Sequence, residues 1–514
     1  MGRTLHLSRR PTLPGLRPAR RPCCPPGPKR RSGSSPRPER GRPARSGRRR
    51  HAVTGMVERA AAAARAEGAG AAEGERSEPL GNITHSASVA GEWFALRDRK
   101  PGKVDRSDPA QRQAARDTAR GERWDLRRAM RGFTESRRVR SCGRAGARED
   151  GSVVLRVTDA TGTAAESSTG ATGSVAGFGG LFHCGNVWLC PECSTKIAAA
   201  RAAELESVLA HHIAAGGWAI LVTVTMRHHR GHGLDQCLTA AGRGWRAVVS
   251  GRRWQDDKAA SGFAGYARAL EITESPENGW HVHFHAVIVF SARPSDDMVE
   301  HVVEGMFSRW SAGLVKAGMP APSREHGLDV QHLDPDAGAG RSFGSVRAWA
   351  KYVTKGIAAE ATLGVTKSAR GGNRTARELM RDALAPQRWE NPANGQHVLT
   401  VDQTARVRLR EYERAVKGRK MLTWSTGRHD LREAAGLGEE RTDDEIAADD
   451  LDGEDVAVIT RDGWRAVKAR ATELLSVTET AGPDAARRWL TERGVDWYAP
   501  TRLTDQHRRH VETG

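Results

Sequence analysis

A chain of 514 residues is long enough for two or three domains, each with a buried core of its own. The formal net charge of +19 suggests a nucleic-acid ligand, but residues 1–50 alone carry a net +15, so the nearly neutral remainder would bind DNA only through a local basic patch. No stretch approaches the roughly 20 apolar residues of a membrane span, and the Arg- and Pro-rich N-terminus lacks the hydrophobic centre of a secretory signal, so we expect a cytoplasmic protein with no membrane partner.

The first 85 residues have the composition of a disordered arm. Ten of the chain's 23 prolines fall in the first 50 residues, and a run rich in Ala, Glu and Gly follows. Such a segment cannot bury enough apolar surface to offset the entropy lost on ordering. The arm is interpreted either as a DNA-binding extension or as a solvated tail, and Met56 is an alternative translation start; the composition favours a tail without function.

Residues 86–175 are polar and weakly patterned, and a cysteine cluster overlaps and follows them. Cys184, Cys190 and Cys193 fall within ten residues, and Cys142 is a plausible fourth member. Four thiolates fit a closed tetrahedral structural Zn2+ site, which can staple a loop-rich segment. His183 is a rival fourth ligand, and the simpler alternative is a group of buried free thiols. The odd total of seven cysteines also favours thiols or metal ligands over disulfides.

The remaining elements follow from hydrophobic periodicity. In chain order, we predict a helix over 194–211, a buried strand over 217–226, a helix over 234–249, two strands over 265–273 and 280–290, a helix capped by Ser295, a short strand over 328–332 and a helix over 345–355 that ends at Gly356. The turn-rich sequence ESPENG joins the two strands in the middle of this order as a hairpin. Strands and helices in this order predict an α+β domain with an antiparallel sheet and flanking helices.

The second strand of the hairpin carries His281, His283 and His285 at alternate positions. Alternate residues of a strand share a face, so three imidazoles would lie side by side, as the ligands of a divalent metal do. If the hairpin is centred near Glu277, Glu271 lies opposite His283 and adds a carboxylate; a slip by one residue would turn it to the other face. The pattern favours a metal site over a solvated face that merely contains histidines.

The helix over 345–355 carries Tyr352 and Lys355, which are three residues apart and therefore share a face. A phenol has an ordinary pKa of about 10 and is a poor nucleophile near pH 7. A nearby cation would favour the phenolate and neutralise a phosphate that it attacks. Taken alone, the pair is typical of a half-buried aromatic residue and a surface charge, and only the histidine strand upstream favours a catalytic pair.

His-hydrophobe-His on a strand, followed about 65 residues later by Tyr-x-x-Lys on a helix, resembles the HUH endonucleases. More closely, the chain is similar to rolling-circle replication initiator (Rep) proteins of Gram-positive, especially actinobacterial, plasmids. The matching stretches are 184–197, 223–229 (TVTMRHH), 266–273 (YARALEIT), 279–290, 350–356 and the run from Glu411 to Ser425. Together with Cys142 they span roughly residues 140–445.

The resemblance implies a role for each of these residues. Catalytic Mg2+ or Mn2+ is held by His283, His285 and Glu271, and His281 is an extra residue behind these ligands. Tyr352 is the nucleophile, and Lys355 helps it by binding the phosphate. Zn2+ in the cysteine cluster is structural. One departure is Ala348, which stands where some relatives have a glutamate that activates water for the terminating cleavage. Either Tyr352 of a second subunit, in a dimer at the origin, or an acid from elsewhere would then complete termination.

The resemblance also implies the substrate and the partners. Tyr352 nicks one strand of plasmid DNA, in a single-stranded or hairpin segment of the double-strand origin, through a 5′-phosphotyrosine intermediate. A host DNA polymerase extends the free 3′ end while a host helicase unwinds the duplex. The chain has no G-x-x-x-x-G-K-[ST] motif, so the helicase activity belongs to a partner.

We therefore expect an α+β protein whose HUH endonuclease-like domain follows a small zinc-binding segment and a disordered N-terminal arm. The expected regions are an arm over 1–85, an N-terminal region with the cysteine segment over 86–215, a catalytic domain over 216–360, a C-terminal family-like region over 361–440 and an acidic, weakly patterned region over 441–514. The alternatives are another HUH enzyme, namely a conjugative relaxase or a single-tyrosine transposase, and a zinc-dependent DNA-binding regulator without catalysis.

Overall fold

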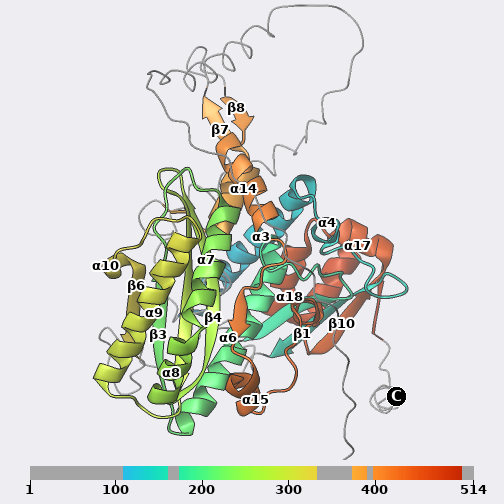
Figure 1. Cartoon of the computed structure of the whole chain (residues 1–514). Helices are drawn as coiled ribbons and strands as arrows, with labels where there is room; N and C mark the ends of the chain where they lie inside the picture. Colours follow the sequence, from blue (N-terminus) through green and yellow to red (C-terminus); the bar gives the residue numbers. More distant parts are fainter. Residues whose placement is uncertain (1–107, 160–172, 333–372, 391–396, 501–514) are drawn as a thin grey trace, which may run out of the picture. The chain divides into compact units, whose positions relative to one another are not determined.

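The computed structural model describes residues 108–159, 173–332, 373–390 and 397–500 (Figure 1). The arm over 1–85 and the helix expected over 345–355 lie outside the described residues. The described chain combines α-helices with antiparallel sheets, which confirms the α+β mixture that the sequence predicted. None of the described helices is long and apolar enough to span a membrane.

A five-stranded antiparallel sheet, which we call the central sheet, has the strand order β6-β3-β5-β4-β9. Its strands are β3 (Trp218–Thr225), β4 (Phe263–Ser275), β5 (Gly279–Phe290), β6 (Leu328–His332) and β9 (Leu422–Trp424). The first four lie within two residues of the strands predicted from the sequence, because buried β-branched runs and alternating patterns are local signals. The edge strand β9 has only three residues, too few for such a pattern.

The β4–β5 hairpin has the register that the sequence predicted. Ser275 pairs with Gly279, which centres the turn on Glu277, and Glu271 pairs with His283. Gly279 has a φ of +77°, and a Cβ at this position would lie 3.0 Å from the Cα of Arg230, so only glycine suits this end of the turn. A fixed turn fixes the face on which every later residue of β5 projects.

Helices α7 (Leu234–Val248) and α9 (Asp296–Lys316) cover the face of the central sheet opposite the histidines. Trp245 of α7 and Trp310 of α9 pack against Phe284 of β5, with ring centroids 6.0 and 6.3 Å away. The two helices meet at Gly244 and Gly313, where a Cβ on Gly313 would lie 2.9 Å from the Cα of Gly244. This packing supports the strand that carries the histidines from behind.

A second antiparallel sheet joins segments about 300 residues apart, in the strand order β11-β10-β1-β2. Its strands are β1 (Val153–Asp159), β2 (Ser174–Gly179), β10 (Glu454–Ile459) and β11 (Trp497–Tyr498). The helices beside it are α3 (Pro109–Phe133), α17 (Arg461–Val467) and α18 (Ala471–Glu492). The helical geometry of α18 is interrupted at Gly482. Trp124, Phe178 and Trp464 form part of its core, with the last two rings 4.9 Å apart. Figure 1 shows these late elements beside the early ones.

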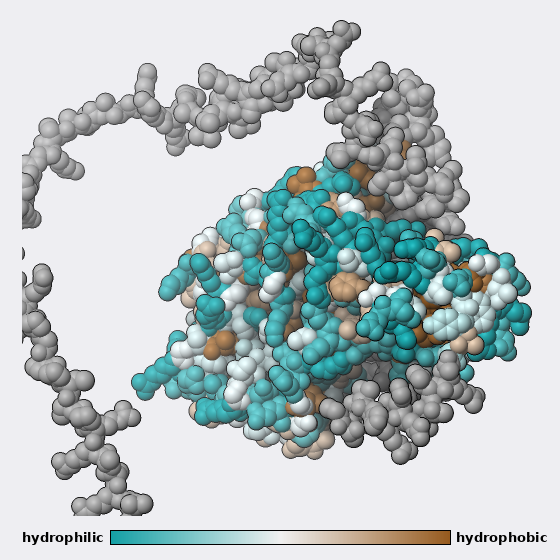
Figure 2. All heavy atoms as spheres, turned by 90° about the vertical axis from the view of Figure 1, so that its right-hand side faces the viewer, coloured by the Kyte–Doolittle hydropathy of each residue, from teal (hydrophilic) through white to brown (hydrophobic). Residues whose placement is uncertain are grey.

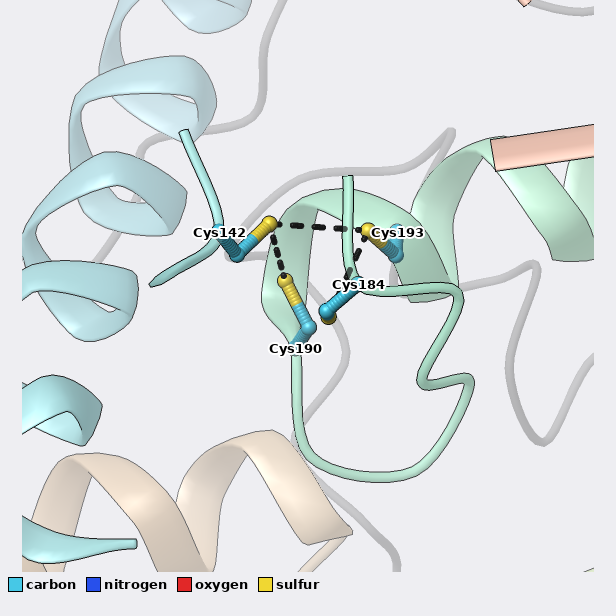
Figure 3. Close-up of side chains that lie close together, drawn as sticks. All are labelled: Cys142, Cys184, Cys190 and Cys193. Carbon is cyan, nitrogen blue, oxygen red and sulfur yellow. Dashed lines mark hydrogen bonds between the residues drawn. The ribbon is translucent and has the colours of Figure 1, made fainter. Parts of the chain in front are cut away.

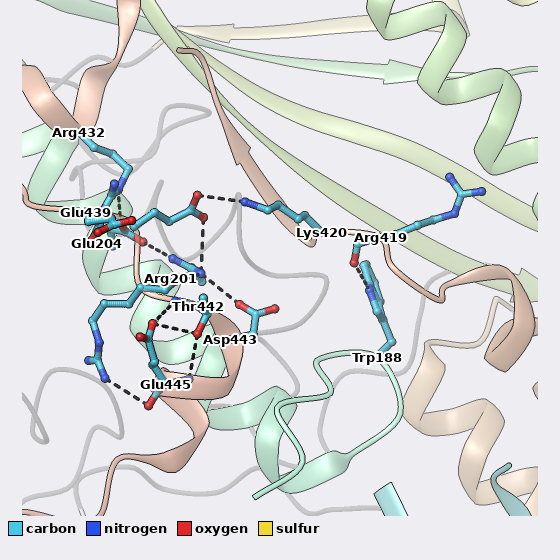
Figure 4. Close-up of polar contacts among 12 residues, drawn as sticks. Trp188, Arg201, Glu204, Arg419, Lys420, Arg432, Glu439, Thr442, Asp443 and Glu445 are labelled. Atoms are coloured by element: carbon cyan, nitrogen blue, oxygen red, sulfur yellow. Dashed lines mark hydrogen bonds and ion pairs between the residues drawn. The ribbon is translucent and has the colours of Figure 1, made fainter. Parts of the chain in front are cut away.

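Polar contacts tie α6 (Pro191–Ala214) to the chain that follows α14 (Gln403–Ala415) (Figure 4). Arg201 of α6 is buried and donates to Glu204 at 3.0 Å and to Asp443 at 3.1 Å. Trp188 Nε1, in the cysteine segment, donates to the backbone oxygen of Arg419 at 2.8 Å. Because a buried guanidinium needs its partners, these contacts hold the late segment along α6.

The other described elements complete the fold. They are α4 (Arg137–Ser141), α8 (Arg252–Ser261), α10 (Arg324–Gly327), α13 (Ala376–Leu384), β7 (Gln387–Glu390), β8 (His397–Thr400), a 3-10 turn (Gly427–His429), α15 (Leu431–Ala434) and α16 (Asp443–Ala448). The predicted cap of α9 is present, since the Ser295 side chain accepts from the N–H of Met298.

Candidate metal centres

Glu271, His283 and His285 converge on one face of the central sheet. Oε2 of Glu271 lies 2.8 Å from Nε2 of His283 and 2.7 Å from Nε2 of His285. One ligand atom from each residue lies within 4.8 Å of the other two. The side chain of Glu271 is 25% exposed and those of His283 and His285 are 11% and 7% exposed, so a substrate can reach the group from one side.

The chemistry of these residues fits a divalent cation. Two imidazole nitrogens and a carboxylate oxygen make a mixed ligand set that leaves coordination positions open. Nδ1 of His285 lies 3.0 Å from Oγ1 of Thr223. A metal would replace the proton between Nε2 of His285 and Glu271, and Nδ1 would then donate to this hydroxyl. Thr223 is the cross-strand neighbour of His285 on β3. It belongs to the 223–229 stretch, but a role for it required the pairing of β3 with β5, which the sequence did not define.

The charges at this group are arranged for cation binding. Burial by itself would raise the pKa of Glu271, but hydrogen bonds from His283 and His285 outweigh it and hold that pKa well below its ordinary value. The carboxylate is therefore an anion at neutral pH. Burial, together with the neighbouring His283 and His228, lowers the pKa of His281 to about 4, so its imidazole is neutral.

His281 faces a different partner from the other two histidines. Its Nδ1 lies 2.9 Å from Nε2 of His228, whose Nδ1 lies 3.2 Å from the backbone oxygen of Asn278 in the hairpin turn. His281 is thus adjacent to His283, with ring centroids 5.0 Å apart, but it is not one of the three grouped ligands. His228 belongs to the same 223–229 stretch as Thr223 and was not assigned a role from the sequence.

The four predicted cysteines form a second group (Figure 3). Cys142 follows α4, Cys184 and Cys190 lie in the segment before α6, and Cys193 lies in the first turn of α6. All four are buried, and their sulfur atoms lie within 4.8 Å of one another. The closest separations are 3.4 Å between Cys190 and Cys142 and 3.7 Å from Cys193 to both Cys142 and Cys184.

These sulfur positions fit a tetrahedral metal. A Zn–S bond of about 2.3 Å places tetrahedral sulfur atoms about 3.8 Å apart, close to the separations observed. The group consists of four thiols, and His183, the rival ligand, is not part of it. Cys237 is buried separately in α7, and Cys23 and Cys24 lie outside the described residues.

The family model described as "Replication protein" matches residues 183–470. The chain belongs to this replication protein family. It is 30% identical to "Protein rep" of Streptomyces lividans over 362 residues, which cover 59% of this chain and 76% of that protein. It is also 30% identical to "Neomycin resistance protein" of Streptomyces cyanogenus over 154 residues, 25% of this chain and 35% of that protein. No solved structure matches the chain.

The resemblance identified from sequence motifs is therefore confirmed: the chain is a plasmid replication initiator of the actinobacterial Rep type. Both candidate metal centres overlap the matched range. Glu271, His283 and His285 lie inside it, as do three of the four cysteines, whereas Cys142 precedes it.

The catalytic pair predicted for this Rep protein, Tyr352 and Lys355, lies outside the described residues, as does Ala348. The described chain resumes at residue 373, where Arg374 is bound to Glu274. Nη2 of Arg374 lies 2.6 Å from Oε2 of Glu274, and the backbone N–H of Glu274 donates to the backbone oxygen of Arg374 at 2.9 Å. Glu274 is 2% exposed and follows Glu271 by three residues along β4. The partners are 100 residues apart in sequence, so no local pattern predicted this contact.

Proposed function

We propose that this Rep protein initiates rolling-circle replication as an HUH-type endonuclease, by metal-dependent, site-specific nicking and joining of one strand at the plasmid's double-strand origin. The observation that carries the proposal is the convergence of Glu271, His283 and His285 on one face of the central sheet. A metal-dependent phosphodiester-cleaving enzyme needs such a ligand group beside the scissile phosphate. A relaxase or a transposase would use the same chemistry, but membership of the replication protein family favours the plasmid origin as the substrate.

In this proposal, His283, His285 and Glu271 hold Mg2+ or Mn2+. When bound, the ion supplies Lewis-acid stabilisation of the negative charge that develops on the phosphate oxygens. Thr223 fixes the orientation of the His285 ring through the contact at Nδ1. The anionic Glu271 offsets part of the ion's charge while leaving a net positive site for the DNA phosphate.

Tyr352 is the proposed nucleophile. Its hydroxyl loses a proton, Oη forms a bond to phosphorus, and the bond between phosphorus and the 3′ oxygen breaks. The products are a 5′-phosphotyrosine and a 3′ oxygen that takes up a proton. Lys355, three residues further on, neutralises charge on the attacked phosphate.

Structural and cellular parts complete the proposal. Zn2+ bound by Cys142, Cys184, Cys190 and Cys193 staples the loop-rich segment within the N-terminal region over 86–215. The catalytic domain over 216–360 and the regions over 361–440 and 441–514 follow. A host polymerase extends the 3′ end, and a host helicase unwinds the duplex. Release of the circular strand uses Tyr352 of a second subunit or an acid from elsewhere, since Ala348 cannot activate water.

The test is nicking of a supercoiled plasmid that carries the element's own origin, with and without Mn2+. Wild-type protein is expected to give open circles linked covalently to the protein through a 5′ end, only with metal, and Tyr352→Phe none. Tyr498→Phe is the matched control, because Tyr498 is 46% exposed and remote in sequence from the candidate site. Equal nicking by Tyr352→Phe would show that another group is the nucleophile, and DNA binding without nicking under any divalent ion would favour the non-catalytic regulator.

A further inference from the structure

A pocket of about 720 Å³ lies beside the second sheet, outside the two candidate metal centres. It is lined by α3, by the turn that follows Cys142 and by α17 with the two residues after it. Seven of its twelve described lining residues are Arg or Lys, and none of the twelve is acidic. The side of the molecule that carries α17 is predominantly hydrophilic (Figure 2). This concentration of charge contrasts with the net +4 of residues 51–514.

Two arginines of α3 that line the pocket, the buried Arg127 and the half-buried Arg131, each have a donor without a partner among the described residues. Arg127 is 4% exposed, and its guanidinium carbon lies 4.0 Å from the ring centroid of Trp124. Arg131 donates from Nη2 to the backbone oxygen of Cys142 at 2.7 Å. Nε of each arginine is buried and has no hydrogen-bond partner among the described residues. These guanidinium groups add to the positive charge of the pocket wall, which favours a ligand that supplies anionic oxygen atoms.

Repulsion among these cations also favours the binding of an anionic ligand. Burial, followed by the charges of Arg127 and Arg144, lowers the pKa of Arg131. Like charges held this close destabilise the empty pocket, and an anion between them removes the penalty. The turn at Gly143 shapes this wall, because its φ of +73° and the adjacent Arg127 guanidinium leave no room for a side chain.

The rim of the pocket extends the positive charge along α17. Arg461, Arg465 and Lys468 follow one another at helical spacings of four and three residues and are all exposed. They cover about 10 Å along the helix axis, which is the length of about three successive phosphates of one DNA strand. Arg465 pairs with the exposed Asp462 in its own turn, a weak contact that a phosphate would readily replace.

We propose that this basic pocket binds the phosphate backbone of duplex DNA and is a second DNA contact, separate from the metal centre that cuts the strand. A single phosphate would neutralise part of the charge in the pocket, but only a continuous backbone would also reach the three cations of the rim. The proposal takes its ligand from the proposed function, since a nicking enzyme must hold the duplex beside the nick. Binding itself needs neither metal nor Tyr352.

The test is salt-dependent binding of the full-length chain to a fluorescent 30-base-pair duplex, followed by anisotropy with no added divalent metal. The variant is Arg461→Ala/Arg465→Ala/Lys468→Ala. Each lost phosphate contact lowers the slope of log K against log salt by about 0.9, so we expect a decrease of about 2–3 in the slope and roughly a hundredfold weaker binding at 0.15 M salt. The control variant neutralises three exposed cations outside the pocket, Arg246→Ala/Arg252→Ala/Arg253→Ala, and should bind as wild type does.

A rim variant with wild-type slope and affinity would overturn the proposal. Displacement of the duplex by micromolar inorganic pyrophosphate at constant ionic strength would also overturn it, because the pocket would then be a site for a small phosphorylated ligand. Wild-type nicking of an origin oligonucleotide with Mn2+ is measured in parallel. If the wild-type protein binds the duplex but never nicks the oligonucleotide, the proposed function alone is contradicted. If the wild-type protein nicks and the rim variant binds the duplex as tightly as wild type, the second DNA contact alone is contradicted.

Discussion

Two glycines of α7, two residues apart, should respond in opposite directions to replacement by alanine. No atom lies within 4 Å of the position that a Cβ would take at Gly242. Alanine there should therefore raise the free energy of unfolding by about 1 kcal/mol, the difference in helix propensity between the two residues. At Gly244 the same Cβ would lie 2.7 Å from two ring carbons of Trp310.

The cost at Gly244 follows from how Trp310 is held. Ordinary contacts begin near 3.4 Å, so the ring or α7 would have to move by about 0.7 Å. Trp310 is fully buried, and its Nε1 donates to the backbone oxygen of Thr225 at 3.0 Å, so the ring cannot turn away without losing that bond. Overpacking costs about 1–3 kcal/mol and the lost bond about 1 kcal/mol. After the propensity gain, Gly244→Ala should lower the free energy of unfolding by about 1–3 kcal/mol.

The measurement is urea unfolding followed by far-UV circular dichroism, with wild type and both variants in parallel. The two variants should differ by about 2–4 kcal/mol at equal denaturant slopes. If Gly244→Ala is as stable as Gly242→Ala, the close approach of α7 to α9 is wrong, and so is the support that these helices give to β5 from behind.

Two further predictions concern buried polar groups. Burial raises the pKa of Cys237 to about 11, which leaves roughly 0.1% thiolate at pH 8. Iodoacetamide at pH 8 should therefore modify Cys237 slowly in the folded chain and quickly after unfolding in urea, as mapped by peptide mass spectrometry, and equally fast modification in both states would refute its burial. Glu274→Gln should lower the free energy of unfolding by about 2–4 kcal/mol, because it leaves Arg374 without its buried carboxylate. The control is Asp444→Asn, which removes the ion pair with Arg138, whose side chains are both more than half exposed. This change should lower the free energy of unfolding by under about 1 kcal/mol. Equal urea midpoints for the two variants would contradict the prediction.

The sequence alone determined the features that depend on neighbours along the chain. A strand alternates its side chains with a period of two, so the placement of His283 and His285 on one face required only that β5 be a strand. The turn between β4 and β5 is equally local, and its position sufficed to place Glu271 opposite His283. The cysteine spacing and the order of motifs were also enough to identify the replication protein family.

Only the tertiary structure decided which distant segments meet. The second sheet pairs β1 with β10 across about 300 residues, and β10 has six residues in a stretch of weak pattern. The contact of Arg374 with Glu274 and the basic pocket between α3 and α17 likewise join residues that no local period relates. Local periodicity reports which face of an element is buried, but the partner of that face is chosen by the packing of the whole chain. For that reason the grouping of Glu271 with His283 and His285 could be predicted residue by residue, whereas the contacts of Thr223 and His228 and the basic pocket required the fold.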